Sequence, residues 1–291
     1  MGGEYVLHRI GRTEVLHQLG ASARLRFAFR KAYELVWAVV SVTRTTNRRP
    51  SGDQAVPHQA QPLAYGVVGN PGPPPPAPSR TIVYVDGFNL YYGALKDTPY
   101  KWLNLDTLCR LLLAQHHTID RIKYFTAQVS ARPDDPDQAT RQQIYFRALR
   151  TIPHLDIILG HFLTSHVRMR LVNPPAQGPR TAQVIKTEEK GSDVNLATML
   201  LVDGFQDRYD VAAVISNDSD LALPIRMVRQ ILHKPVVVFN PHAMNPKSKP
   251  SKTLRQVASQ YRPIRAGALA SSQFAPNLVD ANGGFNKPAT W

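Results

Sequence analysis

The stretch Thr81-Ile-Val-Tyr-Val-Asp-Gly-Phe-Asn89 decides the fold. Its β-branched and aromatic run is typical of a buried parallel strand, and the run stops abruptly at Asp86. Gly87 permits a tight turn, from which Asn89 projects. Ligands of α/β sheets bind outside the carboxyl ends of the strands, so Asp86 is a candidate functional residue. The alternative is that Asp86 and Asn89 only satisfy turn and cap hydrogen bonds.

Two later segments place carboxylates in similar positions. Val214-Ile-Ser-Asn-Asp-Ser-Asp220 again runs from an apolar strand into acids, here Asp218 and Asp220. Lys190-Gly-Ser-Asp-Val-Asn195 puts Asp193 in the first turn of a predicted helix. An Asp at a helix start also serves as a cap or complements the helix dipole, and this reading stays open for each segment alone.

Taken together, the acids predict a metal centre. Carboxylates gathered at one sheet edge repel one another unless a cation neutralises them, and hard oxygen ligands favour Mg²⁺ or Mn²⁺. We predict that the metal-binding and catalytic residues are Asp86, Asp193, Asp218 and Asp220. The polar residues beside them that we assign to substrate binding are Asn89, Lys190, Asn195, Ser216 and Asn217.

The three segments, in this order, resemble the NYN domain, a branch of the PIN-like nuclease superfamily that includes the LabA-like proteins. The resemblance rests on D-G-x-N after the first strand, K-G-x-D-V opening a helix and S-N-D-S-D after a later strand, and it runs from about Thr81 to about Ile264. It implies a Rossmann-like, PIN-like α/β/α fold whose acidic divalent-metal site hydrolyses RNA. One departure is clear: many members carry a second Asp near the position of Met199, and this chain has none there.

Composition favours a polyanionic partner and a reducing compartment. The 291 residues are 43% hydrophobic, enough for one substantial core. Their formal charge of +14 favours RNA as a partner over an acidic protein. The single cysteine, Cys109, lies on an apolar helical pattern and rules out a disulfide within the chain. No stretch approaches the ~20 apolar residues of a membrane span. We therefore expect a cytoplasmic protein with RNA as partner, no membrane contact, and homo-oligomerisation as an open possibility.

The chain divides into three parts. Residues 1–79 are expected to be a poorly structured basic extension, with a possible helix over 21–43 and a Pro-rich linker over 69–79. The Arg-rich start also faintly resembles an organelle transit peptide. Residues 80–264 are expected to form the nuclease domain, and residues 265–291 a flexible tail.

Strand and helix patterns alternate within the central part. The predicted strands are 81–86, 121–129, 155–162, 211–216 and 235–239, and the predicted helices are 104–114, 136–150, 192–205 and 221–232. Such alternation predicts a three-layer α/β/α fold with a mainly parallel sheet. Residues 173–180 read as an exposed basic loop, either a substrate contact or a hairpin tip without function.

Three functions follow from these features. The first is a metal-dependent ribonuclease. The second is the activity for which some proteins with a similar domain are named, hydroxylation by a 6-hydroxy-3-succinoylpyridine monooxygenase; the sequence has neither a G-x-G-x-x-G loop after a strand nor a two-His-one-carboxylate pattern for it. The third is a catalytically weak RNA-binding regulatory module, which the missing acid near Met199 favours.

Overall fold

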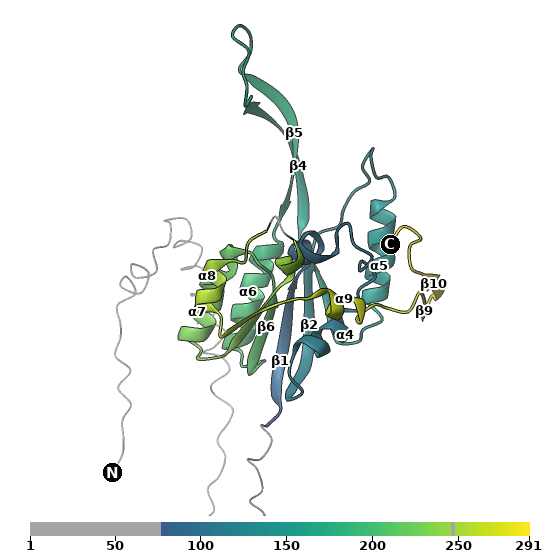
Figure 1. Cartoon of the computed structure of the whole chain (residues 1–291), viewed down its shortest axis with the longest axis vertical. Helices are drawn as coiled ribbons and strands as arrows, with labels where there is room; N and C mark the ends of the chain where they lie inside the picture. The colour runs from purple at the N-terminus through teal and green to yellow at the C-terminus, as the bar shows by residue number, and fades with distance from the viewer. Residues whose placement is uncertain (1–76, 246–247) are drawn as a thin grey trace, which may run out of the picture. The chain divides into compact units, whose positions relative to one another are not determined.

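The computed structural model describes residues 77–245 and 248–291 (Figure 1). The predicted helix at 21–43 and most of the predicted linker at 69–79 lie outside these residues. In the part that the structure describes, no helix is both long and apolar enough to span a membrane.

A six-stranded parallel sheet forms the centre of the domain. Its order is β3-β2-β1-β6-β7-β8, and every neighbouring pair is parallel. The strands are β1 (Ser79–Asp86), β2 (His117–Thr126), β3 (Leu155–Leu159), β6 (Val211–Ile215), β7 (Val236–Asn240) and β8 (Gln260–Pro263). This arrangement confirms the predicted fold class and adds β8, which the sequence analysis missed.

Helices cover both faces of the sheet, so the domain has three layers (Figure 1). One face packs on α4 (Leu105–Leu112), α5 (Gln138–Leu149) and α9 (Ala266–Ala270), and the other on α6 (Ser192–Phe205), α7 (Ala222–Gln230) and α8 (Lys252–Val257). Side chains alternate along a strand, so Val83 and Val85 of β1 enter the first core while Ile82 and Tyr84 enter the second. Burial on both faces explains the continuous apolar run of β1.

A buried polar group ties α6 to the sheet. The Asp203 carboxylate of α6 accepts a hydrogen bond from the Tyr84 hydroxyl at 2.7 Å and lies 2.5 Å from the Lys123 ammonium of β2. Burial is the main cause that raises the pKa of Tyr84, so this hydroxyl stays a donor. Each buried polar atom of the trio therefore has a partner.

The chain leaves the sheet at Gly160, immediately after β3. We predicted one strand over 155–162; instead a second one, β4 (His161–Arg170), begins there and pairs only with β5 (Thr181–Lys190), as an antiparallel ribbon. A Cβ on Gly160 would lie 2.6 Å from the Lys190 carbonyl oxygen and 2.4 Å from Glu189 Oε1. Only glycine fits where the ends of the ribbon meet.

Residues 265–291, which we expected to be a flexible tail, pack on the first core. They form α9 and the hairpin of β9 (Asn277–Asp280) and β10 (Gly283–Asn286). The buried Trp102 ring lies 5.7 Å from the Phe274 ring and 6.3 Å from the Trp291 ring. Cys109 is buried in the same core, as predicted, and burial raises the pKa of its thiol.

Candidate active site

A cavity of about 800 Å³ opens at the carboxyl end of the sheet. Asp86 lies at the end of β1, Asp218 follows β6, and Asp193 begins the first turn of α6. All three carboxylates line the cavity. Three segments, the first of which lies more than 100 residues before the other two, thus bring predicted acids to one place, at the position where parallel α/β sheets bind ligands.

Asp86 is the most buried of these acids, with 4% of its surface exposed. Its carboxylate accepts hydrogen bonds from the Asn89 backbone N–H and the Ser216 hydroxyl, both at 2.9 Å, and it caps the short helix α3 (Gly87–Leu90). Burial raises the pKa of Asp86 to about 7, and the charges of Asp193 and Asp218 add to this increase. A buried carboxyl with raised pKa that faces a cavity is typical of a functional site.

Asp193 shares this electrostatic field. Burial is the first cause that raises its pKa to about 6, followed by the charges of Asp218, Glu189 and Asp220. Asp220 is exposed and does not line the cavity; its backbone N–H donates to Asp218 Oδ1 at 2.9 Å. The structure therefore brings three of the four predicted acids to the cavity, while Asp220 lies outside it and acts on Asp193 through its charge.

The chemical type of these side chains, though not their spacing, suits a hard divalent cation. In residues 77–245 and 248–291, no three acid, imidazole or thiol groups stand at the mutual distances of a ligand set. Burial is nevertheless the first cause that raises the pKa of Asp86 and of Asp193, and the charges of neighbouring carboxylates raise it further. A cation of charge +2 among carboxylate oxygens would relieve that repulsion, and such oxygens are the ligands Mg²⁺ and Mn²⁺ prefer.

Two residues assigned to substrate binding, Ser216 and Asn217, make hydrogen bonds that hold neighbouring segments in place. Ser216 is fully buried; its hydroxyl donates to Asp86 and accepts from the Asp218 backbone N–H at 3.0 Å. The Asn217 side-chain oxygen accepts from the Ser251 N–H at 2.8 Å and the Tyr261 hydroxyl at 2.7 Å. These hydrogen bonds give both side chains a positioning role. Their part in substrate binding stays a prediction.

Asn89, Lys190 and Asn195 differ in their access to the cavity. Asn89 lines it, and its side-chain oxygen accepts from the Asn217 backbone N–H at 2.8 Å. Lys190 and Asn195 do not line it: the Lys190 ammonium lies 3.7 Å from Glu188, and the Asn195 backbone N–H donates to the Gly191 carbonyl at the start of α6. Their assignment to substrate binding has no support in the geometry, because neither faces the cavity.

The sequence analysis missed Glu189 as a site residue. Its carboxylate lines the cavity and accepts from the Ser192 N–H at 3.0 Å and the Ser192 hydroxyl at 2.8 Å. An acid four residues before Asp193 was a usable signal, but the direction of its side chain depends on the β4–β5 ribbon. Aromatic and cationic side chains complete the wall: Phe88, Tyr91, Tyr92, Lys96, Lys101, Tyr124, Arg132, Arg141, Tyr145, Phe162 and Trp291.

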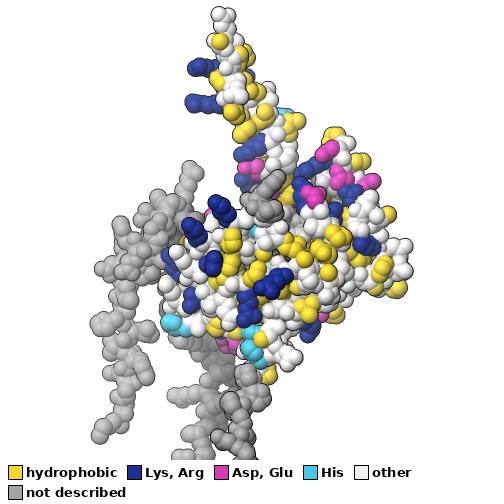
Figure 2. Space-filling model, viewed as in Figure 1, with side chains coloured by type: hydrophobic (Ala, Val, Ile, Leu, Met, Phe, Trp, Pro, Cys, Tyr) yellow, Lys and Arg dark blue, Asp and Glu magenta, His cyan; other side chains and the backbone are white. Residues whose placement is uncertain are grey.

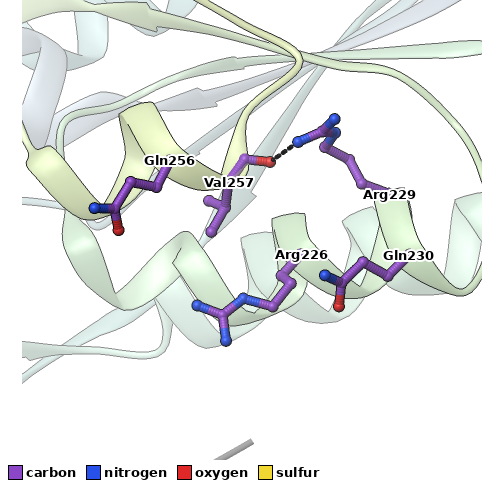
Figure 3. Close-up of a pocket in the computed structure, with 5 residues that line it drawn as sticks. All are labelled: Arg226, Arg229, Gln230, Gln256 and Val257. Carbon is purple, nitrogen blue, oxygen red and sulfur yellow. Dashed lines mark hydrogen bonds between the residues drawn. The ribbon is translucent and has the colours of Figure 1, made fainter.

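A second hollow, of about 190 Å³, lies between α7 and α8 (Figure 3). Two arginines, two glutamines and Val257 line it, and Arg229 donates to the Val257 carbonyl at 2.8 Å. No carboxylate and no predicted site residue reaches it, so the chemistry belongs to the larger cavity.

Comparisons with known proteins place this site in a family. The NYN domain family matches residues 80–265. A curated protein of Pseudomonas putida, named 6-hydroxy-3-succinoylpyridine 3-monooxygenase HspA, is 31% identical over 237 residues, which cover 74% of this chain and 76% of that protein. A solved structure of a Vibrio parahaemolyticus protein of unknown function is 15% identical, covers 68% of this chain and 97% of its own, and has a TM-score of 0.42. At that score the likeness adds nothing to the fold assignment.

Proposed function

The chain belongs to the NYN domain family, and from this premise we propose that it is a metal-dependent ribonuclease. The observation that carries the proposal is the meeting of Asp86, Asp193 and Asp218, one from each family motif, in a single cavity. The family makes a nuclease-type hydrolase the expected class of enzyme. The metal and the RNA substrate are the parts that we add.

Asp86, Asp193 and Asp218 would hold Mg²⁺ or Mn²⁺, with Glu189 beside them. When bound, the ion would supply Lewis-acid stabilisation of the phosphate and of the leaving oxygen. Ser216 keeps Asp86 and the Asp218 turn in register through its two hydrogen bonds. These two hydrogen bonds would hold Asp86 and the Asp218 turn in place before a substrate arrives.

The remaining cavity wall suits a nucleic acid strand. The Phe88 and Phe162 rings lie 5.9 Å apart, edge to face, at the cavity, and such rings stack on unpaired bases. Lys101 and Arg132 line the cavity and have no ion-pair partner among the residues that the structure describes. They would hold backbone phosphates while the acids act on one of them.

The decisive experiment compares two isosteric changes. We expect the full chain to cut a fluorescent single-stranded RNA in Mn²⁺ and to lose this activity in EDTA. Asp86→Asn should slow cleavage roughly a thousandfold, since ~4 kcal/mol of transition-state stabilisation is lost, while RNA binding stays near that of the wild type. The control is Asp207→Asn, the same chemical change at an exposed residue with φ 54°, a conformation that Asn tolerates.

Two results would contradict the ribonuclease. One is wild-type cleavage that persists in excess EDTA, and the other is Asp86→Asn protein that cuts as fast as Asp207→Asn protein. RNA binding without any cleavage would favour the regulatory module instead.

A second candidate is oxidation of a small aromatic acid. The name of the Pseudomonas putida relative suggests it. Aromatic rings together with Arg132 in one cavity would suit a ring that carries a carboxylate. Purified protein should then show absorbance from a bound redox cofactor and consume oxygen with 6-hydroxy-3-succinoylpyridine. Neither signal is expected from a ribonuclease.

A further inference from the structure

The β4–β5 ribbon, residues 161–190, is called the arm below. Figure 1 shows it standing away from the body of the domain. Ten residue pairs join its two strands, from His161 opposite Lys190 to Arg170 opposite Thr181. An isolated two-stranded ribbon is only marginally stable in water, and large apolar side chains such as Ile185 are exposed on it. A segment built this way is suited to contact something outside the domain.

The pairing register gives the arm two different faces. Directly paired residues of an antiparallel ribbon share a face, and the face alternates from one pair to the next. The Thr164 and Thr187 hydroxyls, 3.0 Å apart, illustrate one such pair. The cavity face carries Phe162, Thr164, His166, Arg168 and Arg170 with Glu189, Thr187, Ile185, Gln183 and Thr181; the outer face carries His161, Leu163, Ser165, Val167 and Met169 with Lys190, Glu188, Lys186, Val184 and Ala182.

The cavity face is continuous with the candidate active site. Phe162, Thr187 and Glu189 all line the cavity, and all three belong to this face. Further out on the same face come Arg168 and Arg170. The ribbon twist turns the face gradually without mixing it with the other one. A ligand bound at the carboxylates can therefore continue along this face and leave the body of the domain.

The charge of the arm favours a polyanion on that face. Residues 163–187 contain Arg168, Arg170, Arg180 and Lys186 and no acid. Figure 2 shows Lys and Arg side chains projecting from the arm. Among the residues that the structure describes, Arg168 and Arg170 have no ion-pair partner, whereas the Lys186 ammonium of the outer face lies 2.8 Å from Glu188. Arg180 likewise has no ion-pair partner in the described part of the chain, but it lies near the arm's tip on the outer face, opposite Leu171. Two of the three unpaired arginines of the arm therefore lie on the face that leads to the cavity.

We propose that the cavity face of the arm is a binding track for single-stranded RNA, in which Arg168 and Arg170 hold backbone phosphates several nucleotides away from the reacting one. This inference rests on the proposed ribonuclease function. A strand rises ~3.4 Å per residue, so Arg168 lies roughly 20 Å along the arm from Phe162. That distance equals about six stacked nucleotides. The track therefore acts on long RNA and cannot act on a trinucleotide.

The test compares two double variants of the full chain that remove the same charge. R168Q/R170Q changes the cavity face. R180Q/K186Q changes the outer face, because the Leu171 N–H donates to the Arg180 carbonyl and continues the register by one pair. Binding of a fluorescent RNA of about 20 nucleotides is measured by anisotropy in EDTA over a salt series, and cleavage of this RNA and of a trinucleotide is measured in Mn²⁺. Thermal unfolding checks that both variants fold.

We expect R168Q/R170Q to bind the long RNA about tenfold more weakly, with a log–log salt slope shallower by about 1.4, since two phosphate contacts are lost. Its cleavage of the trinucleotide should equal that of the wild type, and R180Q/K186Q should stay close to the wild type on both substrates. Equal weakening by both variants would overturn the track in favour of a general positive field. Loss of trinucleotide cleavage in R168Q/R170Q would also overturn it.

Two further outcomes separate this inference from its premise. A wild-type protein that neither binds nor cuts RNA overturns the ribonuclease and the track together. A wild-type protein that cuts RNA, combined with an R168Q/R170Q variant that changes only its sedimentation and not its RNA affinity, overturns the track alone and assigns the face to a protein contact.

Discussion

Strand β1 and the arm are both β-structure, yet they differ in how much of each face is buried. Both faces of β1 are buried, one in each hydrophobic core, whereas both faces of the arm are largely open to solvent. Side chains of β1 are therefore constrained by packing, and those of the arm are free to follow what the arm contacts. From this difference we expect the domain to fold without its arm, although Phe162, Thr187 and Glu189 at the base of the arm line the cavity.

The largest expected effect is on the free energy of unfolding, when one apolar side chain in the core and one on the arm are each replaced by alanine. Leu200→Ala removes a fully buried side chain of α6 and should lower the free energy of unfolding by about 2–5 kcal/mol. Ile185→Ala, at a residue that is 70% exposed, should change it by less than about 0.5 kcal/mol. Urea unfolding of both variants measures the contrast. Comparable losses would mean that the arm belongs to the cooperative core.

The junction of the two regions should show a smaller loss. Gly160→Ala places a Cβ against the Lys190 carbonyl and the Glu189 carboxylate, so we expect a cost of about 1–3 kcal/mol and weaker RNA cleavage, because Glu189 must shift. Gly267→Ala in α9 is the control: nothing lies within 4 Å of its added Cβ, and Ala favours the helix by about 1 kcal/mol. Melting temperatures that move in the same direction would contradict the tight junction.

A still smaller effect concerns pH and the carboxylates where the two regions meet. The raised pKa of Asp193, about 6, exceeds the unfolded value of about 3.9. The folded state then binds more protons between these values, so this group lowers stability as pH rises from about 4 to about 6. Without metal, Asp193→Asn should raise the melting temperature by about 2 °C at pH 8 and by nothing at pH 3.5.

With metal present, the difference in melting temperature between the wild type and Asp193→Asn should reverse. Ligand binding to the folded state stabilises it, so Mn²⁺ should raise the melting temperature of the wild type more than that of Asp193→Asn. A variant that is no more stable than the wild type in EDTA at pH 8 would argue against charge repulsion in the cavity.

The smallest expected effect comes from removing the arm. Replacing residues 165–186 by Asn-Gly joins Thr164 to Thr187 through a two-residue turn of the kind that such hairpins favour. We expect unfolding within about 0.5 kcal/mol of the wild type and unchanged trinucleotide cleavage. Long RNA should bind more weakly. Failure of this shortened chain to fold would contradict the independence of the two regions.

These contrasts also explain how far the sequence could be read. The cores produce strong patterns: the apolar runs of β1 and β6 and their terminal acids predicted the sheet and the meeting of Asp86 with Asp218. The arm has no such pattern, because its side chains bury little surface on either face. The apolar run at 155–162 continues past Gly160, so it was predicted as one strand although two strands meet there. Glu189 was missed with it. Phe274 and Trp291 pack on Trp102, which is more than 150 residues away in the sequence. No local sequence pattern could therefore predict that the C-terminal residues pack on the core.

The buried trio of Tyr84, Lys123 and Asp203 has a consequence for the setting of α6, the helix that begins beside Asp193. If only apolar side chains joined this helix to the sheet, it could slide or rotate at a small cost in free energy, because one apolar neighbour would replace another. Here a one-turn shift would strand a carboxylate and an ammonium without partners inside the protein. The trio therefore allows only one position of α6 on the sheet. Replacing all three residues by well-packed apolar ones should preserve the fold but let the position of the first turn of α6 vary.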